Sequence, residues 1–271
     1  LMGDDASNTI LTYDDYAREI MPGGIKRGTF RTYTLFLDAP DITLCNLTVE
    51  NAAGSGKEVG QAIALYAEGE GIRVENCRLI GSQDTLFTGP LPEKEKEPGG
   101  FRGPKEFAPR INGRQYYKNT YICGGVDFIF GSATAYFENC TLESLPEGGG
   151  YVTAGSSPEG QTYGYIFNHC HLTAADNINK VYLGRPWRPY AHTLFMNCTM
   201  DSHIRPEGWE NWRNPENEKT ARYQEYNNTG AGANTSKRVS WSHQLTKKEA
   251  QGITIEKVFH SDTSWLPSCM K

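Results

Sequence analysis

The chain has 271 residues, of which 38% are hydrophobic and 22% charged, and its formal net charge is −5 at pH 7. This composition is typical of a globular protein that is long enough to bury a substantial core. The negative charge argues against nucleic acid as a partner. No apolar run approaches the ~20 residues of a membrane-spanning helix, which argues against a membrane partner. The seven cysteines contain no CxxC pair, so a complete disulfide framework is excluded and a zinc site is not expected.

A loose repeat runs along the chain. Each copy reads apolar, polar, Asn or His, then Cys or Leu, and the copies are residues 44–49, 74–79, 137–142, 167–172 and 195–200, with a weaker one at 118–122. Alternation of period two predicts strands, and a repeat of about 20 to 30 residues predicts a solenoid. A right-handed parallel β-helix, an all-β fold, satisfies both expectations.

Equivalent side chains of stacked coils should form ladders, because neighbouring coils lie ~4.8 Å apart. An asparagine ladder is expected at a coil corner, formed by Asn46, Asn76, Asn119, Asn139 and Asn197. An inward ladder is expected beside it, formed by Cys77, Cys140, Cys170 and Cys198. Free cysteine behaves as a small buried hydrophobe, so we expect these thiols to pack rather than to react.

Three segments put reactive side chains beside glycines. Residues 81–87 follow a predicted strand directly and contain Asp84, which should therefore lie at a coil edge. In residues 124–131, Asp127 interrupts an apolar run that otherwise looks buried. The third segment is 182–187, which includes an Arg-Pro-Trp sequence. Each segment alone is a weak signal, because Asp is a common turn residue, and the combination carries the argument.

Burial of Asp127 would be costly unless its charge is paired. Arg185 is the natural partner, because a guanidinium binds a carboxylate in a fork geometry, and this pair should hold Asp127 ionised. Asp84 has no cation beside it in the sequence. If it lies close to Asp127, repulsion between like charges should raise its pKa. One ionised and one protonated carboxyl is a usual arrangement for a nucleophile with a general acid.

Taken together and in order, these segments resemble the pectin methylesterase family, and the resemblance covers most of the chain. The matching motifs are residues 60–66, 81–86, 126–131, 183–187 and 225–236. The resemblance implies the same parallel β-helix, as one catalytic domain over residues 1–271. It also implies hydrolysis of C6 methyl esters of homogalacturonan, which gives methanol and de-esterified pectin.

The family's roles carry over residue by residue. Asp127 would be the nucleophile that attacks the ester carbonyl, and Asp84 would be the general acid and then the general base. Gln61 and Gln83 would donate hydrogen bonds to the tetrahedral oxyanion. Arg185 would orient Asp127 and keep it charged.

The resemblance also implies a substrate platform and a setting. Trp187 would form part of a sugar platform, with Tyr66 and Phe130 as further contacts. No metal or organic cofactor is implied. The expected partner is methyl-esterified pectin, bound by a monomer that is secreted or periplasmic. This location is inferred from the substrate, because the chain begins without a basic start or an apolar signal stretch.

Two features depart from the family pattern. A polar stretch rich in Gly, Pro, Lys and Glu, at about residues 90–112, separates two motifs that the family joins more directly. It is either a solvated surface loop or a segment that borders the cleft and changes which pectins fit. The strand and capping helix that precede the segment matched by residues 1–11 are absent. We therefore expect a longer natural protein or another element that covers this end, since an uncovered solenoid end exposes strand edges.

Two other functions are compatible with a β-helix. A polygalacturonase or pectate lyase needs an aspartate cluster with Gly-His-Gly, or a calcium-binding carboxylate set, and no Gly-His-Gly occurs in the sequence. A catalytically silent β-helix that binds polysaccharide would have lost reactive groups. All five of the implied groups are present in this chain, which argues against the silent protein.

Overall fold

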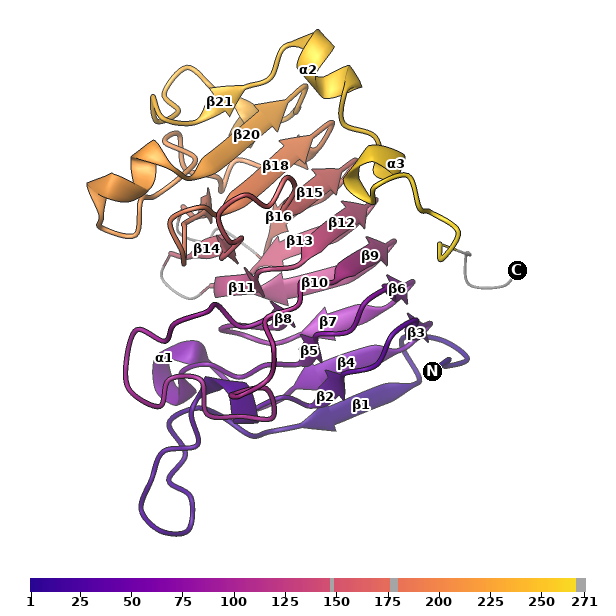
Figure 1. Ribbon diagram of the computed structural model, residues 1–271, viewed down its shortest axis with the longest axis vertical. Coiled ribbons are helices and arrows are strands. Elements are labelled where there is room, and N and C mark those ends of the chain that lie inside the picture. Colours follow the sequence, from indigo (N-terminus) through magenta and orange to yellow (C-terminus); the bar gives the residue numbers. More distant parts are fainter. Residues whose placement is uncertain (147–148, 176–179, 267–271) are drawn as a thin grey trace.

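The computed structural model describes residues 1–146, 149–175 and 180–266, and its strands form three sheets that run along one solenoid (Figure 1). The named strands that pair in these ranges are all parallel. The seven-stranded sheet contains, in order, β1 (Ile10–Tyr13), β4 (Thr48–Asn51), β7 (Arg78–Ile80), β10 (Tyr121–Gly124), β13 (Thr141–Ser144), β16 (His171–Ala174) and β19 (Thr199–Met200). The predicted parallel β-helix is confirmed.

The other two sheets complete each coil. The eight-stranded sheet contains β3 (Thr43–Cys45), β6 (Ile72–Glu75), β9 (Arg114–Lys118), β12 (Thr134–Glu138), β15 (Tyr165–Asn168), β18 (His192–Met196), β20 (Arg222–Tyr226) and β21 (His243–Gln244). The six-stranded sheet contains β2 (Leu35–Leu37), β5 (Leu65–Ala67), β8 (Leu86–Thr88), β11 (Val126–Gly131), β14 (Tyr151–Gly155) and β17 (Tyr182–Gly184). From β2 to β19 the chain visits the six-, eight- and seven-stranded sheets in turn, so each circuit adds one strand to every sheet.

The repeat seen in the sequence marks the corner between the eight- and seven-stranded sheets. The Asn or His of every copy has left-handed backbone, with φ between 49° and 55°, at Asn46, Asn76, Asn119, Asn139, His169 and Asn197. Asparagine tolerates this conformation better than most residues, because its short polar side chain bonds locally. Each copy is therefore not one strand, as the alternation suggested, but the end of one strand, a corner and the start of the next.

The asparagine ladder is present in two separate parts. Asn119 Nδ2 donates to Asn76 Oδ1 over 3.1 Å. Higher in the solenoid, the Asn227 amide donates to Asn197 Oδ1 over 2.9 Å, and Asn227 also has positive φ, so the ladder has a member that the sequence pattern missed. Asn197 in turn donates to Asn168, because His169 occupies the corner of that coil.

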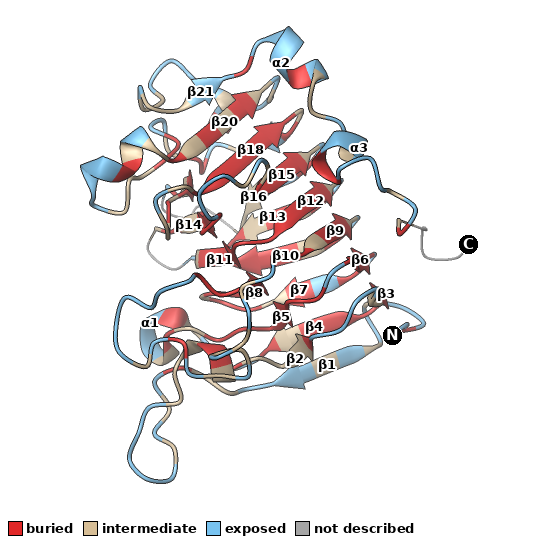
Figure 2. Ribbon diagram, in the orientation of Figure 1, coloured by how far each residue is buried: buried red, intermediate tan, exposed pale blue. Residues whose placement is uncertain are grey.

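The strands of the solenoid are largely buried (Figure 2), and buried apolar residues from successive coils form one hydrophobic cluster. The predicted inward thiols are free, and each is at most 2% exposed: Cys77, Cys140, Cys170 and Cys198. Four aromatic rings stack behind them at centroid separations of 4.6, 4.4 and 4.4 Å, formed by Tyr117, Phe137, Phe167 and Phe195.

Helices are short and lie at the margins. They are α1 (Gly56–Val59), α2 (Lys247–Gln251) and α3 (Ile255–Val258), with 3₁₀ turns η1 (Thr29–Arg31), η2 (Pro215–Lys219) and η3 (Ala231–Ala233). At α2, Thr246 and Glu249 form a reciprocal capping box. Over the described ranges, none of the helices combines the length and apolar character required to cross a membrane.

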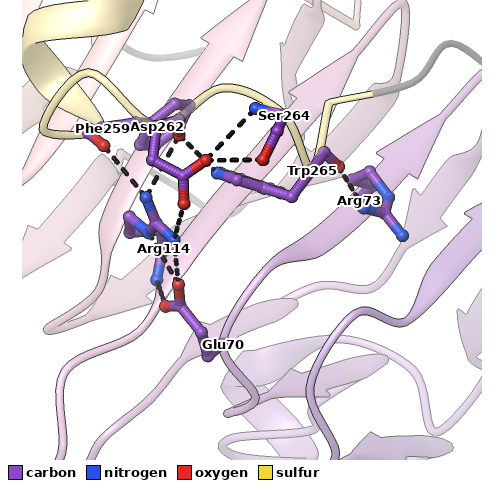
Figure 3. Close-up of polar contacts among 7 residues, drawn as sticks. All are labelled: Glu70, Arg73, Arg114, Phe259, Asp262, Ser264 and Trp265. Carbon is purple, nitrogen blue, oxygen red and sulfur yellow. Dashed lines mark hydrogen bonds and ion pairs between the residues drawn. The ribbon is translucent and has the colours of Figure 1, made fainter.

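The C-terminal segment after α3 runs back toward the early coils (Figure 1), and Figure 3 shows its polar contacts there. Arg114 Nη1 donates to the carbonyl oxygens of Phe259 and Asp262 over 3.0 and 3.2 Å, and its guanidinium also binds Glu70. Arg73 donates to the carbonyl oxygen of Trp265. These contacts fix the segment after α3 to β6 and β9. At the other end, β1 is an edge strand with exposed apolar residues, and the predicted covering element stays a prediction.

Candidate active site

The residues singled out in the sequence meet along the six-stranded sheet, with Gln61, Gln83 and Asp84 just before its strands and Arg185 just after β17. Backbone bonds between coils set their order. The Ala62 amide donates to the Gln83 carbonyl over 3.0 Å, and the Asp84 amide donates to the Val126 carbonyl over 3.0 Å. The Arg185 amide donates to the Thr153 carbonyl over 3.0 Å. Gln83 and Asp84 therefore lie one coil from Asp127 at the same edge of the six-stranded sheet, whereas Arg185 lies two coils from Asp127 and follows the end of β17.

Both aspartates have left-handed backbone, with φ of 64° at Asp84 and 50° at Asp127. Asp127 also lies where the register between β11 and β14 shifts, between Val126 and Ile129. A bulge re-aims a side chain that would otherwise follow the alternation of the strand. Asp127 therefore lines a cleft together with Asp84, although the strand that carries it is apolar and buried from Phe128 onward.

Arg185 and Asp127 form a bidentate ion pair. The Arg185 Nε donates to Asp127 Oδ1 over 2.9 Å, and its Nη2 donates to Oδ2 over 2.7 Å. The guanidinium is itself held by two rings, with its carbon 3.8 Å from the ring centroid of Tyr151 and 4.0 Å from that of Trp212. Fork geometry combined with aromatic contacts leaves the guanidinium little freedom. The predicted pairing is present, and the two rings that support it are additions from the structure.

The two carboxyls have different electrostatic surroundings. Burial, followed by the nearby charge of Asp127, raises the pKa of Asp84 well above its usual range. Burial also raises the pKa of Asp127, but the charge and hydrogen bonds of Arg185 oppose that rise. Since the guanidinium bonds both oxygens of Asp127, we assign the anion to Asp127 and the proton to Asp84. This division is the one that a nucleophile and a general acid require.

Gln61 and Gln83 line the same cleft. The Gln83 side chain also hydrogen-bonds Asp84. It is fixed from behind by α1, since a Cβ on Gly56 would lie 2.6 Å from the Gln83 Cβ, and the Gly56 amide donates to Ser82 Oγ over 2.8 Å. Gly56 is thus a supporting residue that the sequence motifs did not reveal. Two amides beside an acid and a carboxylate can stabilise a developing oxyanion without titrating themselves.

The cleft has a volume of about 300 Å³. Its lining comprises Thr29, Phe30, Gln61, Gln83, Asp84, Lys96, Glu97, Gly100, Phe101, Asp127, Phe130, Ala154, Arg185, Trp187, Arg188 and Trp212. Trp187 and Phe130 thus lie where the resemblance implied. The sequence motifs missed Phe30 and Trp212. The only sequence signal for Trp212 was a second tryptophan three residues after Trp209.

Tyr66 does not reach the cleft, contrary to its expected role as a substrate contact. Its side chain is 0% exposed. Tyr66 pairs in register with Phe87 of the next coil, and their rings meet edge to face at 4.7 Å. Phe30 and Tyr33 from the preceding loop cover it, at centroid distances of 6.2 and 5.9 Å. Tyr66 therefore supports the floor beneath the cleft.

The stretch at about residues 90–112 borders the cleft. Phe101 is 6% exposed and its ring lies 5.8 Å from Phe30 and 6.3 Å from Trp187. The Arg110 guanidinium donates to four carbonyl oxygens of the same stretch and so ties it together. Lys105 anchors it to Asp38 over 2.7 Å. Of the two expectations for this stretch, the contacts favour an ordered wall of the cleft.

A parallel β-helix whose cleft joins a guanidinium-bound carboxyl, a buried second carboxyl and two amides fits the class of carboxylic ester hydrolases. A sequence model of the Pectinesterase family matches residues 1–91 and 110–262. The chain belongs to the pectinesterase family. Residues 92–109 lie outside this match and fall within the stretch that borders the cleft.

Individual relatives agree with this assignment. The chain is 35% identical over 266 residues to Pectinesterase 31 of Arabidopsis thaliana, covering 95% of this chain and 75% of that protein. It is 30% identical over 264 residues to Pectinesterase QRT1 of the same plant, covering 96% of this chain and 63% of that protein. The chain thus spans 75% and 63% of the length of these two relatives.

Solved structures give the same result. The pectin methylesterase from carrot superimposes with a TM-score of 0.81 at 29% identity, covering 98% of this chain and 78% of that one. A pectin methylesterase crystallised in complex with a hexasaccharide superimposes with a TM-score of 0.78 at 28% identity, covering 98% and 83%.

Proposed function

We propose that this chain hydrolyses the C6 methyl esters of homogalacturonan, releasing methanol and leaving de-esterified pectin. The observation that carries the proposal is the two-pronged Arg185–Asp127 ion pair in the same cleft as the buried Asp84. Membership of the pectinesterase family supports the substrate class. A relative of similar fold was crystallised in complex with a hexasaccharide.

In the first half of the reaction, an Asp127 oxygen attacks the ester carbonyl carbon. The carbonyl π electrons move to oxygen, and the amides of Gln61 and Gln83 donate hydrogen bonds to the oxyanion. As the tetrahedral intermediate collapses, the bond to the methoxy oxygen breaks and Asp84 supplies the proton that makes methanol. An acyl-enzyme, an anhydride between Asp127 and the sugar carboxyl, remains.

In the second half, water attacks the sugar carbonyl of the anhydride. Asp84, now ionised, takes a proton from that water and so returns to its starting form. The same two amides stabilise the second oxyanion. Collapse releases the galacturonate carboxyl and frees Asp127, which Arg185 again holds as an anion. No external acid, base or cofactor is required for the balance of atoms.

The sugar ring would rest against Trp187 and Phe130, which line the cleft. Aromatic faces suit the apolar C–H side of a sugar and leave its hydroxyls free for polar contacts. We further propose that the protein acts as a monomer, secreted or periplasmic, where pectin occurs. Light scattering in solution tests the first statement, and fractionation of the source cells tests the second.

The test is methanol release from highly esterified pectin, with reducing ends and unsaturated products measured in parallel. We expect methanol alone from the wild type. Asp127→Asn should lower turnover about 10⁴-fold or more, and Asp84→Asn should lower it strongly, by analogy with the loss of members of a catalytic triad. The matched control is Asp4→Asn, an exposed aspartate near the N-terminus. Undiminished methanol release by Asp127→Asn would reject the mechanism, and chain cleavage without methanol would reject the function.

A further inference from the structure

The Trp212 ring is one of the two surfaces that hold the Arg185 guanidinium. The guanidinium carbon lies 4.0 Å from the ring centroid of Trp212 and 3.8 Å from that of Tyr151. The cation therefore contacts two aromatic rings while it bonds both oxygens of Asp127. Tyr151 is fixed by its place at the start of β14. Trp212 belongs to none of the described strands or helices, so its ring needs another support.

The backbone at Trp212 has an unfavourable conformation. Trp212 and Arg213 have φ of 60° and 55°, and neither is a glycine, asparagine or aspartate, the residues that adopt left-handed backbone most readily. Two successive residues of this kind persist only where their surroundings compensate for the strain. Relaxation of Trp212 toward ordinary backbone would turn the indole ring away from Arg185.

The Glu210 side chain supplies that compensation. Its Oε2 accepts a hydrogen bond from the Trp212 amide over 2.9 Å, and its Oε1 accepts one from the Arg213 amide over 2.9 Å. Successive backbone amides that converge on one anion form a concavity suited to negative charge, and hydrogen bonds to an ionised acceptor are the strong ones. The Glu210 carboxylate therefore stabilises the two left-handed residues directly.

The Glu210 backbone sets the distance between this turn and Arg185. The Glu210 amide donates to the Gly184 carbonyl over 3.1 Å. Gly184 also pairs with Trp209, which is buried, in a parallel bridge. Because Gly184 directly precedes Arg185, Glu210 is tied to the backbone beside Arg185. Through its carboxylate it also fixes the turn that brings the Trp212 ring to the guanidinium.

The segment after the turn has anchors of its own. Asn217 Nδ2 donates to the Asn211 carbonyl over 2.9 Å, and Asn211 Nδ2 donates to Glu218 Oε1 over 2.7 Å. These bonds hold the segment in place, but they do not involve Trp212. Loss of the Glu210 carboxylate should therefore release the Trp212 ring without unfolding the segment.

We propose that Glu210 is a positioning residue for the ester hydrolysis: its carboxylate holds the Trp212 ring against Arg185, and the ring holds the guanidinium in the orientation that Asp127 requires for attack. The inference rests on the proposed function, because it adds a residue to the machinery of that reaction. Among the described residues, those that line the cleft do not include Glu210. Its effect is therefore transmitted through Trp212.

The first experiment is a double-mutant cycle between Glu210 and Trp212, measured as kcat and KM on esterified pectin. We expect Glu210→Ala to lower kcat roughly tenfold, the size of one lost hydrogen bond to a charged group, with a smaller change in KM. Glu210→Gln keeps one acceptor oxygen and should lose less, which separates loss of the charge from loss of the hydrogen bonds. In a Trp212→Leu background, Glu210→Ala should cost about twofold or less, because the ring that it positions is gone.

The matched control is Glu207→Ala, which removes the same charge from an exposed position three residues earlier and should leave kcat at the wild-type value. An unchanged kcat in Glu210→Ala, a loss confined to KM, or additive losses in the double variant would overturn the proposal. The same cycle with Glu210→Gln gives a second test that does not depend on the folding of the alanine variant.

The second experiment needs no turnover. The Nε–H resonance of Arg185, assigned by its loss in Arg185→Lys, is recorded by nitrogen-edited NMR. Trp212→Leu should displace this resonance, because it removes the ring current of an indole in contact with the guanidinium. We expect Glu210→Ala to displace it in the same direction and Glu207→Ala to leave it in place. An unchanged resonance in Glu210→Ala would overturn the proposal. Failure of the proposed function would appear separately, as a wild type that releases no methanol while this displacement persists.

Discussion

Two regions of this solenoid use the same uncommon backbone conformation for different ends. At the corner between the eight- and seven-stranded sheets, residues such as Asn76 and Asn119 have φ near 50° and bond to one another. At the edge of the six-stranded sheet, Asp84 and Asp127 have φ of 64° and 50°. The side chains of the corner asparagines hydrogen-bond to neighbouring coils, whereas the carboxyl groups of the two aspartates line a cleft. Left-handed backbone is thus a structural device at one edge and a means of presenting carboxyls at the other.

The comparison depends on Arg185, which has no counterpart at the corner. Arg185→Lys keeps the charge but cannot form the fork with Asp127, so we expect kcat/KM to fall about 100-fold or more, the size of other lost electrostatic contacts in active sites. Asp127 must be ionised to attack, and a weaker partner raises its pKa. The acidic limb of the kcat/KM profile should therefore move to higher pH. A parallel profile at lower amplitude would mean that Arg185 does not set the charge of Asp127.

A substitution of Gln83 tests whether its side-chain amide stabilises the oxyanion. Gln83→Ala should lower kcat about 100-fold with a smaller change in KM, because an oxyanion donor acts mainly in the transition state. Steady-state kinetics on esterified pectin give both values. A change confined to KM would assign Gln83 to substrate binding.

A substitution of Asp84 tests how much stability the protein loses by burying a carboxyl group at this edge of the sheet. The folded pKa of Asp84 is raised by burial and by Asp127, so its contribution to stability is complete below its unfolded pKa of about 3.9 and is lost as pH rises through the folded value. Asp84→Asn cannot ionise and avoids that loss. We expect its Tm to exceed that of the wild type by about 3 °C or more at neutral pH, with the gap closing toward pH 4. A constant gap across this range would contradict the raised pKa.

The smallest effect is expected at the corner. Asn119→Ala removes the bond to Asn76 and places alanine in left-handed backbone, which costs about 1–2 kcal/mol. Chemical denaturation should register this loss in the free energy of unfolding, while kcat of the folded enzyme stays at the wild-type value. A large fall in kcat would mean that the corner and the cleft are coupled.

The sequence predicted the fold well because the corner imposes a residue type. Left-handed φ favours asparagine at the corner, which every repeat but that of His169 contains, so positions such as Asn139 and Asn197 recur with a spacing that can be read without a structure. Asp127 and its partner Arg185 could also be predicted from the sequence, because a charged residue in an apolar run requires a partner of opposite charge. The repeat did not reveal that each segment bends at its centre, because alternation of apolar residues continues on both sides of the corner.

What the sequence could not supply is which loops fold over the cleft. Tyr66 belongs to a motif that resembles the family, yet Phe30 and Tyr33 cover it. Lys96 and Trp212 reach the cleft from segments with no recognisable pattern. Long-range packing of irregular segments depends on shape complementarity rather than on a residue period, so these neighbours appear only in three dimensions.

The most direct measurement is a crystal structure of the Asp127→Asn variant with a methyl-esterified galacturonate oligosaccharide. The account predicts the ester carbonyl carbon within reach of the side chain at position 127, with its oxygen facing the amides of Gln61 and Gln83. The methoxy oxygen should lie beside Asp84. An ester bound with its carbonyl turned away from these amides, or with its methoxy group remote from Asp84, would contradict the account.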